Sequence, residues 1–361
     1  MIGKMYTNKP TKIGVLGDGG WGTTLSVLLA NKGHTVALWG AFPENIANIK
    51  KDGENKRFLP GIKIPKRVEV TDNLRFVLKD KDLIVLAVPS QHIREILKKI
   101  KMAGYDRKTL YLSVIKGIEI KSSMRISEVI HSELGNIKLA VLSGPTIAYE
   151  VAQRIPTVAV VASHSLEVRK TIQDIFMSDR FRIYTNNDVI GVELGGSLKN
   201  VIAIACGACD GLGFGTNTKA ALLSRGLAEM SRLGHAMGAK TKTFSGISGL
   251  GDLVTTCISP HSRNRFVGEE LGKGKNLKQI INHQRGLAEG VPTAKSAYSL
   301  SLKYKVDMPI VREVYNALYK NKPVLKAFKD LMVREKKQEK KIQNGGWRTL
   351  ASALEWGTRG R

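Results

Sequence analysis

The sequence predicts an α/β fold in which a doubly wound, mostly parallel sheet is followed by an all-helical C-terminal domain. Short apolar runs that resemble buried strands alternate with helix-like segments from residue 12 to about residue 185, as in parallel sheets with crossover helices. A glycine-rich turn joins the first strand to the first helix. From residues 186–190 onward the pattern becomes helical, so the domain boundary is expected there.

The glycine-rich turn is the run Gly17-Asp18-Gly19-Gly20-Trp21-Gly22, between strand-like residues 12–17 and a helix-like segment over 23–34. A second strand over 35–39 completes a unit of about 30 residues, as Rossmann-like dinucleotide-binding domains require. Gly17 is expected to make the tight turn, Gly19 to let the backbone approach a pyrophosphate, and Gly22 to let the helix pack on the strand. The alternative is an ordinary glycine-rich turn.

The end of the second strand usually distinguishes NAD from NADP, because an acid there binds the ribose hydroxyls and an arginine binds the 2′-phosphate. Here the run Trp39-Gly40-Ala41-Phe42-Pro43-Glu44 offers neither an immediate acid nor an arginine. The missing arginine favours NAD, although a lysine from elsewhere can serve NADP. The predicted cofactor is therefore NAD or NADP, with NAD preferred.

Later strands are expected to present polar residues at the sheet edge where open parallel sheets bind ligands. Lys116 lies near the end of the strand-like run 110–119 and is a candidate functional lysine, against the alternative of an ordinary loop lysine. The run 138–142 leads into Ser143-Gly144-Pro145-Thr146, a tight turn before a helix start. The remaining expectations are a loop over 51–67, a strand over 82–90, a helix over 91–101 and a last strand over 157–162.

A second candidate lysine lies in the helical part of the chain. Lys199 is surrounded by the small and apolar residues of the segment 192–205. Desolvation lowers the pKa of a buried lysine toward the range useful for proton transfer, unless a nearby carboxylate opposes the shift. Lys199 is therefore a candidate acid or base, and the alternative is a lysine whose head reaches the surface.

Composition narrows the classes of protein. With 361 residues, 42% of them hydrophobic, the chain can fill two cores. No uninterrupted apolar run is long enough for a transmembrane helix and the first residues lack the centre of a secretion signal, so we expect a cytoplasmic protein without integral membrane association. The net charge of +26 is spread along the chain without a basic stripe interleaved with aromatics, so no nucleic-acid partner is expected.

Three cysteines do not make a disulfide framework in a chain of this size. The Cys-x-x-Cys spacing of Cys206 and Cys209 invites a metal interpretation, but no second pair and no suitably spaced histidine accompanies it. We predict that these cysteines are small packing residues and that no metal is bound.

Eight motifs occur in one order along the chain. They are Gly17 to Gly22 with Trp21, Ile115-Lys116-Gly117, Leu142 to Thr146, Glu193 to Asn200, Asp210 to Gly215, Gly249 to Leu253, Ser262-Arg263-Asn264 and Ala288-Glu289-Gly290. From about Lys12 to about Tyr319 the chain closely resembles the soluble NAD(P)-dependent glycerol-3-phosphate dehydrogenases. The resemblance implies reversible reduction of dihydroxyacetone phosphate to sn-glycerol 3-phosphate for phospholipid synthesis, by a homodimer acting on a phosphorylated small molecule.

The resemblance also implies residue roles. In the family, the lysine at position 199 is the proton donor and acceptor, the lysine at position 116 touches substrate and cofactor, and Asp252 holds the catalytic lysine. The implied substrate-binding set is Lys116, Gly144, Thr146, Lys199, Asn200, Asp252, Thr256, Ser262, Arg263 and Asn264, of which the residues 262–264 match the phosphate-binding set. The implied cofactor-binding set is Gly17, Gly19, Gly20, Trp21, Gly22, Lys116, Ala148, Arg263, Leu287 and Glu289.

The chain departs from the family pattern at a few positions. Asp18 and Gly20 stand where the usual loop has Ala and Ser, and Ala41 stands where bacterial members often carry an arginine. The departure at Ala41 bears on cofactor preference. None of the three departures affects the predicted catalytic chemistry. For the reaction that the resemblance implies, Lys116 and Asn200 are expected to donate hydrogen bonds to the oxyanion that develops on the substrate.

The predicted division of the chain has four parts. They are an N-terminal extension over 1–11, a dinucleotide-binding domain over 12–188, a helical substrate and catalytic domain over 189–324, and a basic extension over 325–361, outside the resemblance. Within the last, residues 324–342 are predicted to form a basic helix, and Gly345-Gly346 to break the chain before Trp347. A docked or mobile appendage is preferred to a lipid-binding surface, because the apolar face is poor.

Two other interpretations stay open from the residues alone. One is another two-domain dehydrogenase, of the hydroxyacid or 6-phosphogluconate type. The other is a basic protein that binds anionic surfaces and keeps the fold only as a scaffold.

Overall fold

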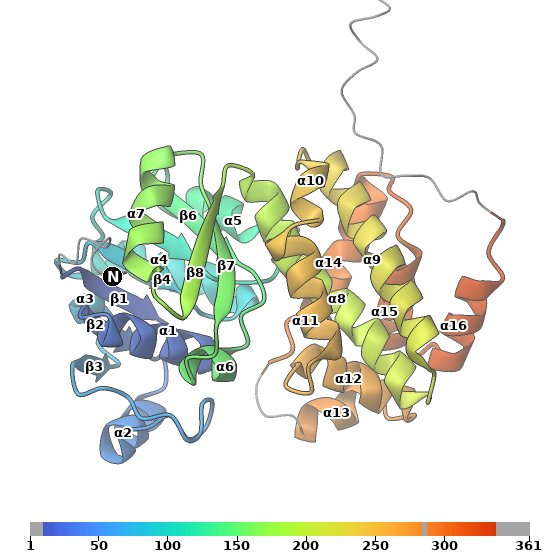
Figure 1. The fold of residues 1–361 in the computed structure, drawn as a ribbon, viewed down its shortest axis with the longest axis horizontal. Helices are drawn as coiled ribbons and strands as arrows, with labels where there is room; N and C mark the ends of the chain where they lie inside the picture. Colours follow the sequence, from blue (N-terminus) through green and yellow to red (C-terminus); the bar gives the residue numbers. More distant parts are fainter. Residues whose placement is uncertain (1–9, 284–286, 337–361) are drawn as a thin grey trace, which may run out of the picture.

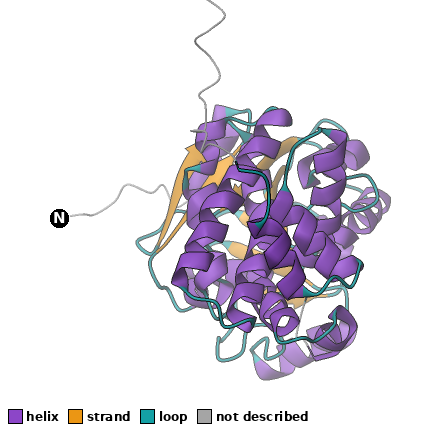
Figure 2. Ribbon diagram, turned by 90° about the vertical axis from the view of Figure 1, so that its right-hand side faces the viewer, coloured by secondary structure: helices purple, strands orange, loops and turns teal. Residues whose placement is uncertain are grey.

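The computed structural model describes residues 10–283 and 287–336. Figure 1 shows a sheet domain beside a domain built of helices, in agreement with the predicted fold class. Seen from the helical side in Figure 2, the helices lie in front of the strands. The two domains meet along α8 (Val189–Gly211), which contacts the sheet at β6 as well as the helices around it.

The sheet has eight strands in the order β3-β2-β1-β4-β5-β6-β7-β8. All neighbours are parallel except β6 and β7, which are antiparallel, so the prediction of a mostly parallel sheet is confirmed. The strands are β1 (Lys12–Leu16), β2 (Thr35–Trp39), β3 (Val68–Thr71), β4 (Leu83–Leu86), β5 (Leu110–Ser113), β6 (Lys138–Ser143), β7 (Thr157–Ala162) and β8 (Phe181–Asn186).

The expectation that residues 157–162 form the last strand was wrong, because β8 follows and pairs with β7. This strand closes one edge of the sheet and is only half buried: Phe181 and Ile183 are buried, and Arg182 and Tyr184 are exposed. An alternating edge strand lacks the continuous apolar run that marks the central parallel strands. For that reason the apolar pattern of the sequence did not predict β8.

Helices cover both faces of the sheet. The predicted helix over 23–34 is α1 (Gly20–Asn31), which begins three residues earlier inside the glycine loop. The predicted helix over 91–101 is a short 3-10 turn (Ser90–His92) followed by α4 (Ile93–Ala103). The other helices of this domain are α2 (Pro43–Asp52), α3 (Leu74–Leu78), α5 (Ile126–Leu134), α6 (Ala148–Ala152) and α7 (Leu166–Phe176).

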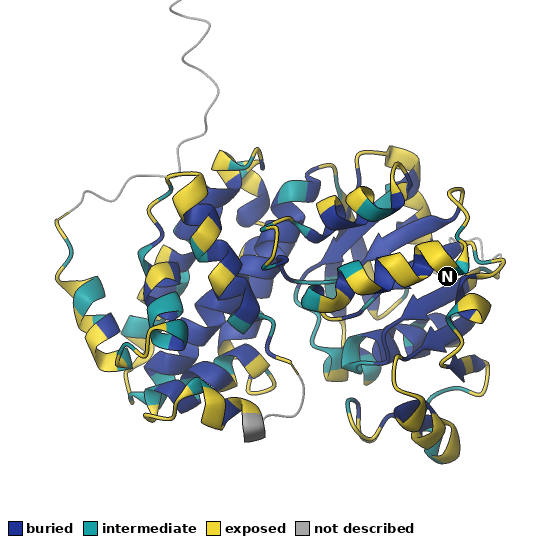
Figure 3. Cartoon of the chain, turned by 180° about the vertical axis from the view of Figure 1, so that it is seen from behind, coloured by how far each residue is buried: buried dark blue, intermediate teal, exposed yellow. Residues whose placement is uncertain are grey.

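The helical domain is organised around α8, whose residues are buried over nearly its whole length (Figure 3). Its composition and 23-residue length would suit a membrane span, but 94% of the apolar window lies inside the protein, as in the core helix of a soluble domain. Cys206 and Cys209 are free thiols in this core. Around it lie α9 (Thr216–Ala236), α10 (Thr241–Phe244), a π-helical turn (Ile247–Gly251), α11 (Asp252–Ile258), α12 (Arg263–Gly272), α13 (Leu277–His283), α14 (Gly290–Lys303) and α15 (Pro309–Tyr319).

The basic helix predicted over 324–342 is shorter than expected. It is α16 (Val324–Met332), and residues 333–336 are not helical because no apolar residue continues the face that packs on the domain. Phe328 meets Phe214 edge to face at 5.2 Å, and Asp330 pairs with Lys322 at 2.6 Å. Residues 337–361, with Gly345-Gly346 and Trp347, and residues 1–9 lie outside the described residues.

The contact between α8 and α12 leads to a test of packing. A Cβ atom at Gly207 would lie 1.9 Å from the Arg265 carbonyl oxygen, so Gly207→Ala has to push the two helices apart. We expect the free energy of unfolding to fall by about 1–3 kcal/mol, as for other overpacked cores. Urea denaturation measures this change.

The matched control is Gly215→Ala, because a Cβ atom there would meet nothing within 4 Å. Gly215 is the N-cap of α9 with ordinary negative φ, so Ala there should cost only the N-cap preference for Gly, about 0.5–1 kcal/mol. Equal stability of the two variants would contradict the close helix contact.

Candidate active site

Three charged side chains from separate parts of the chain meet where the two domains join. Lys116 follows β5 at the carboxyl edge of the sheet, Lys199 lies in the middle of α8, and Asp252 is the first residue of α11. The Lys199 Nζ atom lies 2.6 Å from Asp252 Oδ1, and the Lys116 Nζ atom lies 2.7 Å from Asp252 Oδ2. One carboxylate therefore binds two ammonium groups, one through each oxygen.

This ion triad is largely shielded from water. The side chains of Lys199 and Asp252 are 7% and 1% exposed, and that of Lys116 is 16% exposed. Thr256, one helical turn after Asp252, accepts a hydrogen bond from Lys199 Nζ at 2.5 Å and donates to the Asp252 carbonyl oxygen at 2.7 Å. The Lys199 head is thus held by two acceptors on α11.

Burial and charge act on the triad in opposite directions. Desolvation lowers the pKa of Lys116 to about 8, because it outweighs the attraction of Asp252. Burial by itself raises the pKa of the Asp252 carboxyl, but Lys116 and Lys199 outweigh it and hold that pKa below its ordinary value. The site therefore keeps an ionised carboxylate beside a lysine that titrates near physiological pH.

Two glycines of α8 make this meeting possible. A Cβ atom at Gly195 would lie 2.5 Å from the Ser248 carbonyl oxygen in the π-helical turn. At Gly196 it would lie 2.3 Å from Ser143 Oγ at the end of β6. Because Gly195 and Gly196 have no Cβ atom, α8 can pack closely on the π-helical turn and the end of β6. This packing brings Lys199, one turn further along α8, within reach of Asp252.

Gly144 and Thr146 hold Lys116 in the structure. The Lys116 Nζ atom donates to the Gly144 carbonyl oxygen at 2.7 Å and to Thr146 Oγ1 at 3.2 Å. Gly144 has φ +137°, a backbone conformation that side chains with a Cβ atom rarely adopt. The tight turn after β6 therefore points a carbonyl oxygen at the lysine.

Asn200 is engaged with neighbouring residues, and its expected hydrogen bond to the substrate stays a prediction. Its amide nitrogen donates to the carbonyl oxygens of Lys116 at 3.2 Å and Gly196 at 3.3 Å. Its oxygen accepts from the Asn264 side chain at 2.9 Å, and Asn264 in turn accepts from the Gly290 backbone at 2.8 Å. In this arrangement the two asparagines join α8, α12 and α14 and fix the backbone of Lys116.

Ser262, Arg263 and Asn264 form the N-terminus of α12. The Ser262 hydroxyl accepts from the Arg265 backbone at 3.2 Å and so caps the helix. The N-terminal end of a helix carries unpaired N–H groups and a partial positive charge that suit an anion. The Arg263 guanidinium adds a planar fork for phosphate or carboxylate oxygens, and its side chain remains accessible to solvent.

The glycine loop has the shape that a pyrophosphate needs. Gly17 has φ +120°, and a Cβ atom at Gly22 would lie 1.9 Å from the Gly17 carbonyl oxygen. Nothing lies within 4 Å of a Cβ built at Gly19, so that side of the loop is open beside the N-terminus of α1. The buried Trp21 Nε1 donor has no hydrogen-bond partner among the described residues. These features fit a bound dinucleotide.

The remaining candidates for cofactor contact lie on two sides of the seam. Ala148 begins α6, and its carbonyl oxygen accepts from Thr24 Oγ1 of α1 at 3.0 Å. Leu287 is 43% exposed. Glu289 precedes α14 and accepts from the Ser90 backbone at 2.9 Å and from the Ser90 hydroxyl, so it links the helical domain to the end of β4.

Sequence reasoning missed the part played by Ser90. Burial raises the pKa of Glu289, while the Ser90 hydrogen bonds and the charge of Arg263 oppose the shift. Ser90 follows Pro89 at the carboxyl edge of the sheet, which was a usable signal. Its partner lies 199 residues away, which no local pattern reveals.

The fold and this site together define a two-domain nicotinamide-dependent dehydrogenase, with a dinucleotide cradle in the sheet domain and a buried lysine–aspartate site at the seam. Residues 12–169 match the model for the N-terminus of NAD-dependent glycerol-3-phosphate dehydrogenase, and residues 188–329 match the model for its C-terminus. The chain belongs to the NAD-dependent glycerol-3-phosphate dehydrogenase family and is an NAD(P)-dependent oxidoreductase.

Individual relatives agree over nearly their whole length. The chain is 49% identical over 330 residues to the glycerol-3-phosphate dehydrogenase [NAD(P)+] of Prosthecochloris aestuarii, covering 91% of this chain and 99% of that protein. The crystal structure of a glycerol-3-phosphate dehydrogenase from Coxiella burnetii has a TM-score of 0.88 at 37% identity, covering 90% of this chain and 99% of that one. The structure of glycerol-3-phosphate dehydrogenase from Saccharomyces cerevisiae has a TM-score of 0.76 at 30% identity, covering 90% of this chain and 100% of that one.

The match also corrects the extent of the resemblance. We expected it to end at about Tyr319, but the family model reaches residue 329 and so includes most of α16. A D-mandelate dehydrogenase has a TM-score of 0.57 at 13% identity, which shows a shared fold alone.

The ion triad predicts a pH-dependent stability defect in Asp252→Asn. The variant leaves two buried ammonium groups without their carboxylate. At pH 7 its free energy of unfolding should therefore be about 3–5 kcal/mol lower than that of the wild type. Without the carboxylate, burial lowers the folded-state pKa of Lys116 further below its ordinary value, so the folded variant binds fewer protons than the unfolded chain. The defect should therefore shrink as the pH rises from 7 toward 10.

Urea denaturation at pH 7 and pH 9.5 measures this trend. Thr256→Val is the matched control, because it removes one hydrogen bond and no charge and should cost about 1 kcal/mol with little pH dependence. A defect in Asp252→Asn that is constant with pH would show that the lysines do not depend on Asp252.

Proposed function

We propose that this protein reversibly reduces dihydroxyacetone phosphate to sn-glycerol 3-phosphate with NAD(P)H and so supplies glycerol 3-phosphate for phospholipid synthesis. The observation that carries the proposal is the buried contact of Lys199 with Asp252, placed between the glycine loop and the N-terminus of α12. Family membership supports the same reaction.

Lys199 is the proposed proton donor. When bound, the nicotinamide cofactor supplies the hydride for the C2 carbonyl of the substrate. The Lys199 ammonium gives its proton to the oxygen that becomes the alcohol, and its neutral amine takes the proton back in the reverse direction. Asp252 orients this lysine and holds its charge, while Lys116 adds a second positive charge close to the developing oxyanion.

The proposed role of residues 262–264 is to bind the substrate phosphate. Arg263 contributes a charged planar fork, and the N-terminus of α12 contributes backbone N–H groups. Ser262 and Asn264 shape this end of the helix, since their side chains are engaged in the cap and in the contact with Asn200. The phosphate then serves as a handle that positions C2 against the cofactor.

The cofactor preference, the cofactor-binding residues, the location in the cell and the oligomeric state are also proposals. We infer that both cofactors are accepted and that NADH is preferred, because the end of β2 carries no arginine. The cradle for the cofactor would consist of Gly17, Gly19, Gly20, Trp21 and Gly22, with Ala148, Leu287 and Glu289 at its far side. We further propose a cytoplasmic homodimer.

Lys199→Ala tests the chemistry. Removal of the proton donor should lower kcat/KM for dihydroxyacetone phosphate reduction about 10²- to 10⁴-fold. Binding of NADH, followed by its fluorescence, should be retained because Lys199 is not part of the glycine loop. Lys242→Ala, at an exposed lysine outside the site, is the control. A full rate in Lys199→Ala, or activity with keto acids and none with dihydroxyacetone phosphate, would overturn the proposal.

Arg263→Ala tests the phosphate handle. It should lower kcat/KM for dihydroxyacetone phosphate about 10²-fold, as expected when a charge-assisted contact is lost. The slow reduction of dihydroxyacetone, which has no phosphate, should be unaffected by the same change. Steady-state rates with both substrates give the comparison, and a proportional loss with both would show that Arg263 acts on something other than phosphate.

A further inference from the structure

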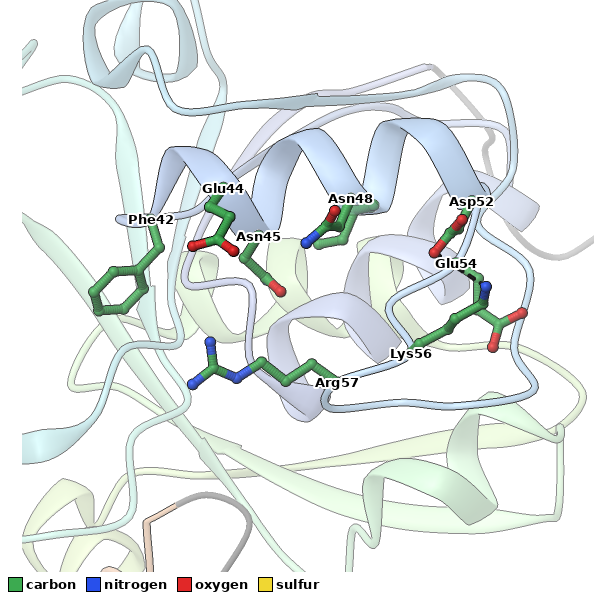
Figure 4. A pocket seen from close by; sticks show the side chains of 9 residues that line it. Phe42, Glu44, Asn45, Asn48, Asp52, Glu54, Lys56 and Arg57 are labelled. Atoms are coloured by element: carbon green, nitrogen blue, oxygen red, sulfur yellow. Dashed lines mark ion pairs between the residues drawn. The ribbon is translucent and has the colours of Figure 1, made fainter.

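A pocket of about 300 Å³ lies between α2 and the loop that follows it. Phe42, Asn45 and Ile49 line it on one side, and Lys56 and Arg57 line it on the other. In Figure 4 the Arg57 guanidinium lies across the pocket at the end nearest Phe42 and Asn45. This end adjoins the carboxyl end of β2, where dinucleotide-binding domains hold the adenosine ribose.

The loop that carries Arg57 is fixed to the glycine loop. Asn55 is fully buried, and its amide donates to the Asp18 carbonyl oxygen at 2.7 Å and to Thr23 Oγ1 at 2.8 Å. A Cβ atom at Gly20 would lie 2.8 Å from the Phe58 carbonyl oxygen, so the loop also packs on the start of α1. Arg57 therefore extends from a backbone held beside the pyrophosphate cradle.

The charges around the pocket leave Arg57 available. Asp52 pairs with Lys56 at 3.1 Å, and Glu54 pairs with Lys63 at 3.4 Å. Within the described residues no carboxylate lies within ion-pair distance of Arg57, whose guanidinium lies 5.0 Å from the centre of the Phe58 ring. Its hydrogen-bond donors are therefore not committed to an acid of this domain.

The N-terminus of α2 provides a second element for an anion. Its first residue, Pro43, has no N–H group, and its N-cap residue, Phe42, makes no side-chain cap, so the N–H groups of the next two residues lack that partner. The Asn45 side chain donates instead to Asp18 Oδ2 at 2.6 Å, which ties this helix end to the glycine loop. Glu44 lies in the same first turn, and its carboxylate opposes a second anion there.

We propose that Arg57, together with the N-terminus of α2, is the element through which this protein recognises the 2′-phosphate of NADP(H), and that Glu44 limits this recognition. The arginine that the end of β2 lacks is thus supplied by the loop after α2. The inference deepens the proposed function and rests on it only in that the sheet domain binds a nicotinamide dinucleotide.

The test is binding, measured without turnover. Dissociation constants of NADPH and NADH, which differ only in the 2′-phosphate, are determined by cofactor fluorescence for the full chain and its variants. Arg57→Ala should weaken NADPH about 10-fold and leave NADH within about twofold, as expected for one charge-assisted hydrogen-bonding group. Lys56→Ala, the neighbouring lysine already paired with Asp52, is the matched control and should change neither constant by more than about twofold.

Further variants and ligands sharpen the outcome. Glu44→Gln should tighten NADPH binding about threefold with little effect on NADH, since it removes one repulsive charge at a helix end. Adenosine 2′,5′-bisphosphate compared with 5′-AMP should show the same dependence on Arg57 by calorimetry, and the dependence should weaken at high salt. Arg57→Gln repeats the test with a side chain of similar length, and thermal unfolding confirms that the variants are folded.

The proposal is overturned if Arg57→Ala weakens NADPH and NADH equally, if it leaves NADPH unchanged, or if the wild-type chain binds neither dinucleotide. The reaction itself is assayed separately with dihydroxyacetone phosphate. Dinucleotide binding that depends on Arg57 without reduction of dihydroxyacetone phosphate would refute the proposed function and support the assignment of Arg57.

Discussion

The buried carboxylate of Asp252, held between two ammonium groups, is the interaction on which the rest of the site depends. Two lysines close to each other in a nearly dry site repel and are costly to desolvate. One aspartate offsets much of that cost because each of its oxygens faces a different lysine, at 2.6 Å and 2.7 Å. In the proposed reaction, the three groups keep a net positive charge at the place where negative charge develops on the substrate oxygen.

The fold brings these groups together through backbone contacts. Lys116 stands at the end of β5, Lys199 lies on α8, and Asp252 follows a π-helical turn packed against Gly195. Asn200 and Asn264 then fix the Lys116 backbone and the start of α12 with one chain of hydrogen bonds. The two asparagines thus position their neighbours.

Much of this architecture was predictable from local sequence, and the remainder was not for physical reasons. The glycine loop and the buried lysine of α8 have signatures within a few residues, so the sheet domain and Lys199 were found directly. The resemblance named Asp252, but sequence could not show that it also binds Lys116, since 136 residues separate them. The half-exposed strand β8, the link between Ser90 and Glu289, and the commitment of Asn200 depend on tertiary contacts without a local pattern.

The position of α8 also governs how the chain is made. Its first turn supplies Val189 and Val192 to an apolar cluster with Val141, Val160 and Ala162 of the sheet. During synthesis, domains nearer the N-terminus emerge and fold first. A sheet that folds first would therefore carry this apolar patch uncovered until the following segment arrives. A cut between residues 188 and 189 would separate the sheet from the segment that covers this apolar cluster.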